Sequence, residues 1–433
     1  MNKVLKSILK LSVLLGAVLS ASSCDWLCPG GNDKDKTYSK VLILYGAGFN
    51  SLSNALQEDI RELSQGEVPA KDADVAIAVI NHCNSNGYAN PTSPVIFRMY
   101  KDSKGKAVYD TLTTLSATDL LTDKEVMKSS LNYVASTLKS DHYGLILSSH
   151  GTGWLPEGYY GKPSDYEPAL DFAPGKTGAA RLMIGDGPLP GPAVRSFGEE
   201  YYYDGATRKK KHMDITDLGQ AIPFHFDYIV FDACLMGCIE TVFELKDKCS
   251  YLGLSPSEIL EEGMQYTTTA GRLLRSGSPD LEGLIDDYFE YYDSKTGLYR
   301  SASYTLIDCS KIDALATACK PVFEKYRSQI AAVDPETVQP YCRGEKHWIY
   351  DLRDILLQAG ATRSDLSSVD EALSRCVLKE VHTPTFFNND EIYGGYEFKN
   401  CCGLGMYLPC DGTEFLDAFY KTLSWNKATS LVQ

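Results

Sequence analysis

Two stretches decide the fold, Leu145-Ile-Leu-Ser-Ser-His150-Gly-Thr-Gly-Trp154 and Tyr228-Ile-Val-Phe-Asp-Ala-Cys234-Leu-Met-Gly-Cys-Ile-Glu240. Each is a short apolar run that stops at a reactive side chain, His150 in the first and Cys234 in the second. Apolar runs of this length, bounded by turn residues, are typical of strands buried on both faces of a parallel sheet. Because the active crevice of an open α/β sheet lies outside the carboxyl ends of its strands, the pattern predicts an imidazole and a thiol close together at one sheet edge.

A thiol beside an imidazole is the arrangement of a cysteine nucleophile with its base. A helix predicted from about Met236 to Lys246 would bring its positive end near Cys234 and favour the thiolate. His150 would then deliver a proton to the leaving amine, and the backbone amides of Gly151 and Cys234 are the candidate oxyanion donors. For an isolated pair, the alternative is that Cys234 packs as a small hydrophobe and His150 is a satisfied turn residue.

The first residues have the pattern of an export signal. Lysines precede an apolar stretch at 11–19 that is too short to span a bilayer, and small residues lead to Cys24. This ending resembles a bacterial lipoprotein signal, which implies removal of residues 1–23 and a lipid on Cys24. The alternative is ordinary secretion with cleavage nearby. Residues 24–38 have the composition of a flexible tether. With a lipid on Cys24, we expect a membrane-anchored lipoprotein, in the periplasm or at the cell surface.

Composition limits the classes of partner and cofactor. Hydrophobic residues make up 44% and charged residues 23% of the chain, as in an ordinary globular protein, and the net charge of −15 argues against binding nucleic acid. The thirteen cysteines show no repeated Cys-x-x-Cys spacing, so we expect no zinc site. Gly185-Asp-Gly187 resembles part of a calcium loop, but the ligands are too few to assign a site. Export permits disulfides, for which the candidates are Cys342, Cys376, Cys401, Cys402 and Cys410.

The order of expected elements predicts an α/β core followed by further helices. Strands and helices alternate through residues 39–308, with a capping box at Thr122 to Glu125 that would open a helix and Ser51 or Ser53 as the cap of an earlier one. Residues 155–211 lack periodicity and predict a long exposed loop. Residues 309–433 are expected to add helices and a late strand at 403–409 to the same unit.

The complete strings Ser149 to Trp154 and Phe231 to Glu240 closely resemble the two catalytic motifs of the clostripain family of cysteine peptidases. A looser resemblance covers residues 39–425, although the family's usual acidic residue is missing near Gly48 to Asn50. The resemblance implies a caspase-like α/β/α sandwich with a mostly parallel sheet, as in gingipains and legumain. It further implies an exported cysteine endopeptidase that acts on polypeptides without an organic cofactor, and we expect it to be a monomer.

Within this resemblance, His150 is the catalytic histidine and Cys234 the nucleophile. Asp232 is expected to help line the primary specificity pocket, where a carboxylate pairs with Arg or Lys and so favours cleavage after those residues. The equally weighted alternative is that Asp232 orients the elbow by accepting backbone N–H bonds. A second pocket acid of the family would fall within Glu258 to Glu262, where this sequence departs from the usual pattern.

The basic run Arg208-Lys209-Lys210-Lys211 is either a solvated charge run or a self-cleavage site in the long loop, where family members are commonly cut. Two rival functions remain open. The chain is either a non-catalytic, surface-anchored binding protein on the same scaffold, or a peptidase for another residue class such as Asp or Asn.

Overall fold

The computed structural model describes residues 36–83, 92–160, 166, 194–195, 198–205, 207–343, 346–390 and 394–433. The predicted signal at 1–23, the predicted lipidation site Cys24, most of the predicted tether and Gly185 to Gly187 lie outside these ranges.

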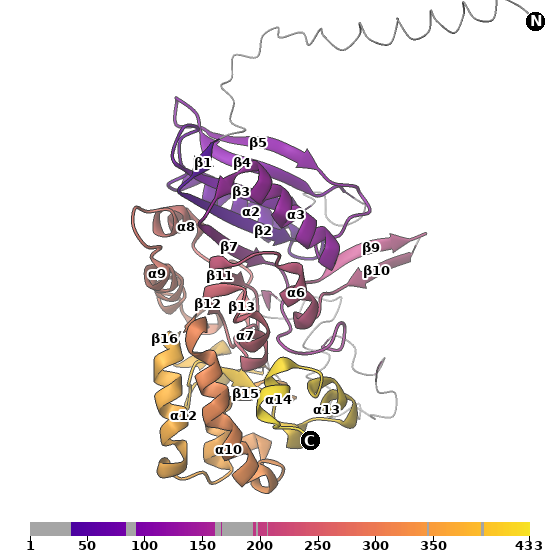
Figure 1. Ribbon diagram of the computed structural model, residues 1–433, viewed down its shortest axis with the longest axis vertical. Helices are drawn as coiled ribbons and strands as arrows, with labels where there is room; N and C mark the ends of the chain where they lie inside the picture. The colour runs from indigo at the N-terminus through magenta and orange to yellow at the C-terminus, as the bar shows by residue number, and fades with distance from the viewer. Residues whose placement is uncertain are drawn as a thin grey trace, which may run out of the picture. The chain divides into compact units, whose positions relative to one another are not determined.

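The apolar runs assemble into a large central sheet (Figure 1). Within the described residues it has nine strands, in the order β16-β14-β12-β11-β7-β2-β3-β4-β5. The five central strands run parallel. These are β12 (Cys249–Leu254), β11 (Phe226–Asp232), β7 (Tyr143–Ser148), β2 (Lys40–Ala47) and β3 (Val75–His82). Antiparallel strands complete both edges, namely β14 (Ser303–Asp308) with β16 (Val377–His382), and β4 (Val95–Lys101) with β5 (Ala107–Thr114).

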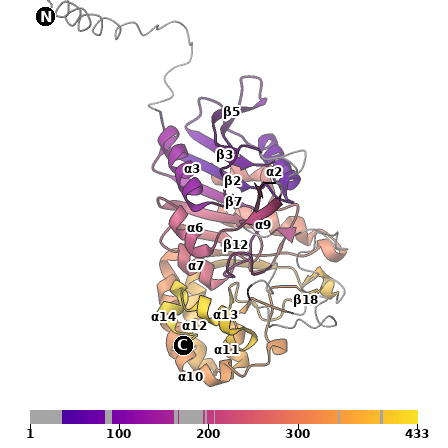
Figure 2. The same cartoon turned by 90° about the vertical axis from the view of Figure 1, so that its right-hand side faces the viewer.

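Helices cover both faces of this sheet, so the predicted α/β/α sandwich is confirmed. Figure 2 shows one set along one side and the other set opposite. The first set is α3 (Lys124–Thr137), α6 (Ile215–Ala221) and α7 (Ile239–Leu245). The second is α2 (Ser53–Gln65), α8 (Tyr266–Leu273) and α9 (Leu281–Asp293). Because both faces are covered, the central strands are largely apolar, and every residue of β7 is buried.

The C-terminal region extends the sandwich. Its helices are α10 (Ile312–Ile330), α11 (Leu352–Gln358), α12 (Arg363–Cys376), α13 (Glu414–Tyr420) and α14 (Ser424–Thr429). Its strand β16 pairs with β14, so the main sheet takes strands from both sides of residue 308. The late strand is shorter than predicted: β19 (Gly405–Met406) pairs with β15 (Tyr350–Asp351) outside the main sheet, and Gly405 also bridges to Cys238.

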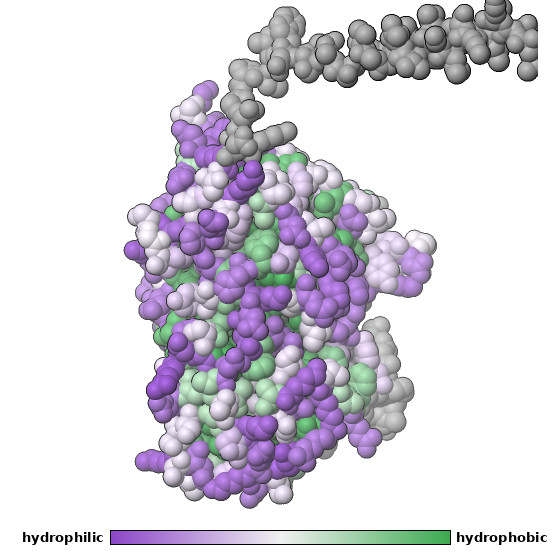
Figure 3. Space-filling view, viewed as in Figure 1, coloured by the Kyte–Doolittle hydropathy of each residue, from purple (hydrophilic) through white to green (hydrophobic). Residues whose placement is uncertain are grey.

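The surface agrees with an apolar core that is well covered. The face in Figure 3 is mainly hydrophilic, with hydrophobic residues in small scattered areas. None of the helices in the described ranges is both long and apolar enough to cross a bilayer.

Three local predictions, on two helix caps and on cysteine pairing, are wrong. Asp123, not Thr122, caps α3 by accepting from the backbone of Glu125 and Val126, and the Thr122 hydroxyl donates instead to Glu200 at 3.2 Å. Among the described residues no side chain caps α2. The proposed cysteine pairing also fails, since the five candidates carry free thiols, namely Cys342, Cys376, Cys401, Cys402 and Cys410.

A buried carboxyl, Glu240, joins the C-terminal region to α7. Its Oε1 accepts from the Tyr407 backbone at 2.9 Å and from the Tyr420 hydroxyl at 2.6 Å. Burial raises the pKa of Glu240 from 4.5 to about 7. A carboxyl whose pKa is raised in the folded state stabilises the fold fully below its unfolded pKa, and this contribution is lost as pH rises through the folded pKa.

Glu240→Gln, which keeps the shape of the protonated acid, is therefore expected to gain stability relative to wild type between pH 5 and pH 8. The difference in unfolding free energy should change by up to about 3 kcal/mol over that interval, because one pKa unit corresponds to about 1.4 kcal/mol. Urea unfolding of both proteins at several pH values measures it. A difference that stays constant with pH would contradict the assignment.

Candidate active site

The register of two parallel strands brings the predicted pair together. Ser148, the last residue of β7, pairs with Asp232, the last residue of β11. His150 and Cys234 each follow two residues beyond this pair, so both leave the same edge of the sheet from neighbouring strands. The two residues therefore follow neighbouring parallel strands, and the pairing of their side chains stays a prediction.

The two motifs also pack against each other. Gly153 has a φ of +61°, and a Cβ built on it would lie 2.8 Å from the backbone oxygen of Leu235 and 3.3 Å from the Cys238 sulfur. Only glycine fits this position, because any side chain would collide with the Cys234 loop. The next residue, Trp154, is fully buried and donates its ring N–H to the backbone oxygen of Trp348 at 3.2 Å.

The loop after Cys234 is a strained elbow held from behind. Leu235 has a φ of +61°, which is rare for a bulky residue, and its N–H donates to the Ser257 oxygen at 2.8 Å. Gly237 donates to the Ser255 oxygen at 2.7 Å, and a Cβ there would lie 2.3 Å from the Pro256 nitrogen. The segment 255–257 thus fixes the elbow.

This elbow corrects the predicted helix start. Helix α7 begins at Ile239, with Cys238 as its N-cap residue, not at Met236. Cys234 therefore lies four residues before the N-cap residue, outside the first turn in which a helix end exerts most of its field. Cys238 is fully buried, and its sulfur lies 3.1 Å from the Thr241 hydroxyl.

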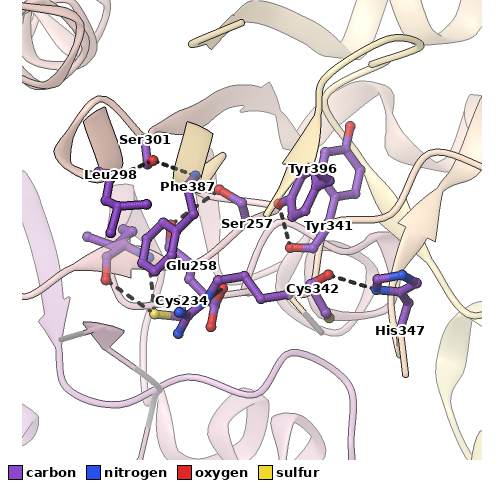
Figure 4. A network of polar contacts seen from close by, with 12 residues as sticks. Cys234, Ser257, Glu258, Leu298, Ser301, Tyr341, Cys342, His347, Phe387 and Tyr396 are labelled. Carbon is purple, nitrogen blue, oxygen red and sulfur yellow. Dashed lines mark hydrogen bonds and ion pairs between the residues drawn. The ribbon is translucent and has the colours of Figure 1, made fainter. Parts of the chain in front are cut away.

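The Cys234 thiol, labelled in Figure 4, contacts the backbone of a short strand, β13 (Ile259–Leu260). The Ile259 N–H donates to the Cys234 sulfur at 3.1 Å, and the Ile259 oxygen lies 3.5 Å from it. A backbone donor to sulfur is an interaction that stabilises the thiolate more than the thiol. The side chain is only 1% exposed, so the thiol is covered in this structure.

His150 is positioned by a residue that the sequence analysis missed. Its Nε2 lies 2.9 Å from the hydroxyl of Ser51, which follows the carboxyl end of β2, the strand next to β7. Asn50 fixes this turn, because its side chain donates to the oxygens of Ala47 and Glu199 and accepts from Leu52. The available signal was that Ser51 follows the end of a third parallel strand.

A buried carboxylate, that of Glu199, also lies near His150. Burial opposes the ionisation of Glu199, but the nearby His150, Lys210 and His212 hold the pKa of its carboxyl below the ordinary value. The Lys210 ammonium lies 3.0 Å from Glu199, and the His212 ring nitrogen 3.7 Å. The Glu199 carboxylate is therefore an acidic group within electrostatic reach of the His150 ring.

Ser51→Ala is expected to lower kcat for peptide hydrolysis roughly two- to tenfold with little change in KM. A hydrogen bond of this kind contributes about 0.5–1.5 kcal/mol, and losing it frees the ring of His150 to leave its working orientation. Steady-state kinetics from pH 5 to pH 9 measures the effect, because an orienting role also shifts the pH profile of kcat. Ser51→Thr, which keeps the hydroxyl, should recover most of the activity. Unchanged kinetics in the alanine variant would rule out this role.

The remaining predicted site residues differ in how deeply they are buried. Asp232 is fully buried, and its Oδ2 accepts from the Tyr266 hydroxyl at 2.8 Å and the Ser148 hydroxyl at 3.2 Å. Gly151 is buried at the same sheet edge. Of the residues 258–262, Glu258 directly precedes Ile259 and is buried, whereas Glu261 and Glu262 are more exposed.

The predicted self-cleavage run lies in regular structure. Residues Thr207–Lys211 form β10, which pairs with β9 (Glu200–Asp204) in a hairpin, so this end of the segment 155–211 is not the predicted loop. Three of the basic side chains have acidic partners, with Lys209 bonded to Asp204, Lys210 to Glu199 and Lys211 to Glu157. The Arg208 guanidinium lies 4.5 Å from the ring centroid of Tyr201.

A cysteine on a strained elbow, a histidine on the neighbouring parallel strand and an α/β/α sandwich define a cysteine peptidase of caspase-like fold. The chain belongs to the clostripain family, whose model matches residues 44–176 and 201–384. It is accordingly a cysteine endopeptidase that acts on polypeptides.

Solved structures of C11 proteases have the same fold. An inactive zymogen C11 protease from Parabacteroides distasonis matches with a TM-score of 0.71 and 22% identity, over 93% of this chain and 99% of that one. A secreted C11 cysteine protease from Bacteroides thetaiotaomicron, in complex with an irreversible peptide inhibitor, matches with a TM-score of 0.69 and 22% identity, over 90% and 99%. No curated protein matches the chain.

Proposed function

We propose that this chain is an exported cysteine endopeptidase that cleaves after Arg or Lys, with Cys234 as nucleophile and His150 as general acid and base. The observation that carries the proposal is the register of β7 and β11, from which both residues emerge at one sheet edge. The thiolate would attack the scissile carbonyl carbon, and the amides of Gly151 and Cys234 would bind the oxyanion. His150 would protonate the leaving amine and then take a proton from the water that hydrolyses the thioester.

Two buried acidic residues support a preference for substrates with a basic residue before the scissile bond. Asp232 ends β11 two residues before the nucleophile, and Glu258 precedes the residue that contacts its sulfur. A carboxylate in a site of low polarity pairs strongly with guanidinium or ammonium and disfavours neutral side chains.

Export is supported by the signal pattern at residues 1–23 and by the relative from Bacteroides thetaiotaomicron that is described as secreted. Lipidation of Cys24 would anchor the enzyme to the periplasmic or outer membrane surface, where it would act as a monomer.

A panel of fluorogenic peptides that differ only in the residue before the cleaved bond tests the specificity. We expect kcat/KM for Arg and Lys to exceed that for Asn, Asp and Ala by at least about 100-fold, with and without added calcium. A preference for Asp or Asn would support a peptidase of another residue class. Hydrolysis of no member of the panel would support the non-catalytic binding protein.

Self-processing is a further part of this proposal. The run Arg208 to Lys211 is one target, and cleavage there would require the β9–β10 hairpin to open. A second target is Arg195, because β8 (Val194–Arg195) pairs antiparallel with β13 and the backbone of Arg195 stands opposite Ile259. Wild-type protein is expected to split into two chains while Cys234→Ala stays intact, and mass spectrometry of the fragments identifies the cut. A wild-type chain that stays whole during full activity would exclude a required cut.

A further inference from the structure

A buried ion pair lies directly beside the nucleophile. The Arg343 Nε donates to the Glu258 carboxylate at 2.7 Å, and the two side chains are only 9% and 4% exposed. Glu258 directly precedes Ile259 in the chain, and the backbone N–H and oxygen of Ile259 contact the Cys234 sulfur. Figure 4 shows Cys234, Glu258 and Phe387 in the same cluster of side chains.

Arg343 also contacts an aromatic side chain from a later segment of the chain, in addition to Glu258. Its guanidinium carbon lies 4.2 Å from the ring centroid of Phe387, within the range of a cation–π interaction. Phe387 opens η5 (Phe387–Asn389), in which three successive non-glycine residues have φ values of 47°, 50° and 51°. Such a run is strained, and strained backbone is common at clamps and switches. The Phe387 N–H donates to the Ser301 hydroxyl at 2.7 Å.

Stability alone does not account for this arrangement. Removing two charges from water costs about as much as their attraction returns, so a buried pair contributes little compared with apolar residues of the same size. Burial by itself would lower the pKa of Arg343, but the attraction to Glu258 and, more weakly, to Tyr160 and Cys234 raises it. The guanidinium therefore stays charged within the field of the nucleophile.

We propose that Arg343 is an internal substitute for the basic side chain of a substrate. It fills the carboxylate site that Glu258 offers beside Cys234 and keeps the peptidase latent until a substrate cation displaces it. This inference rests on the proposed cleavage after Arg or Lys. It agrees with the 1% exposure of the Cys234 side chain, because a filled site and a covered thiol belong to the same closed state.

The experiment compares wild type with Arg343→Gln and with a matched control, Arg353→Gln. Arg353 also pairs with a carboxylate, Asp370 at 2.6 Å, but on a partly exposed surface of α11. In Arg343→Gln we expect KM for Arg and Lys reporters to fall about tenfold, because the closed state no longer competes with substrate. Labelling of Cys234 by an arginyl chloromethyl ketone should accelerate by a similar factor. The control should match wild type in both readouts, and Arg343→Gln combined with Glu258→Gln should lose the gain.

Phe387→Leu provides a second variant that keeps the ion pair and removes only the aromatic face. We expect a smaller gain in the same direction, roughly two- to fivefold. Slower hydrolysis of every reporter and slower labelling in both variants would overturn the proposal, because Arg343 would then support the active geometry. If the variants lost activity only toward peptides with acidic residues, the proposal would be overturned, because Arg343 would then bind a carboxylate of the substrate.

The two hypotheses fail in different ways. If wild type hydrolyses no reporter, the proposed function fails, whereas the labelling rate of Cys234 still reports whether Arg343 closes the site. If wild type cleaves after Arg and Lys but neither variant gains, the proposed function stands and the internal substitute is rejected.

Discussion

Replacing Cys234 by alanine is expected to lower kcat/KM for peptide hydrolysis by at least about 10⁴-fold, because the covalent route is lost together with its nucleophile. The neighbouring Cys238 cannot replace it. That thiol is fully buried, burial raises its pKa far above the ordinary value, and its sulfur is engaged with Thr241. The fold should survive, because the substitution removes one sulfur atom from a site held by backbone bonds.

Cys238→Ala is the matched control for this prediction. It removes a second buried thiol four residues away and is expected to leave kcat/KM within a few-fold of wild type. The measurement is the hydrolysis of an arginyl reporter, with thermal unfolding followed by circular dichroism. If Cys238→Ala abolished activity and Cys234→Ala did not, the nucleophile would be misassigned.

Asp232→Asn is expected to lower kcat/KM for Arg and Lys reporters by roughly 100-fold. The amide keeps the size of the carboxylate and its contact with the Tyr266 hydroxyl, but it lacks the charge that pairs with a substrate cation. A charge-assisted pair in a buried site contributes about 1.5–3 kcal/mol, and 2.7 kcal/mol corresponds to about 100-fold.

The substrate panel separates the two roles proposed for Asp232. In a specificity pocket, the loss is confined to basic residues and falls mainly on KM. If Asp232 instead orients the elbow, all reporters lose activity together and the free energy of unfolding decreases. Asp227→Asn is the control, since Asp227 lies on the same strand but pairs with His142 at a partly exposed position. An Asp232 variant with wild-type kinetics would reject both roles.

Much of the core was predictable because its information is local. Strands such as β7 and β11 are continuous apolar runs with turn residues at their ends, and covered parallel strands require such runs. Once two such strands are neighbours and parallel, their carboxyl ends lie at the same sheet edge. The positions of His150 and Cys234, each two residues past a strand end, were therefore sufficient to predict this edge for both. The resemblance at the two motifs added the family and the roles.

The errors arise where a distant segment determines the local structure. The helix after Cys234 begins late because Leu235 and Gly237 are hydrogen-bonded to residues 255–257, a contact between two loops that are distant in sequence. Thr122 fails as a cap because Glu200 recruits its hydroxyl. Ser51 beside His150 and Arg343 beside Glu258 are likewise long-range pairs, and single-sequence periodicity carries no record of them.

The rate at which iodoacetamide alkylates Cys234, followed by mass spectrometry from pH 5 to pH 9, tests the pairing of thiol and imidazole most directly. A thiolate stabilised by a neighbouring imidazolium reacts at pH values where an isolated thiol is protonated. We predict that His150→Ala slows this labelling at least about tenfold at pH 6 and that the two rates approach each other as the pH rises to 9. Identical rates for wild type and variant across the whole range would contradict a catalytic partnership between these two residues.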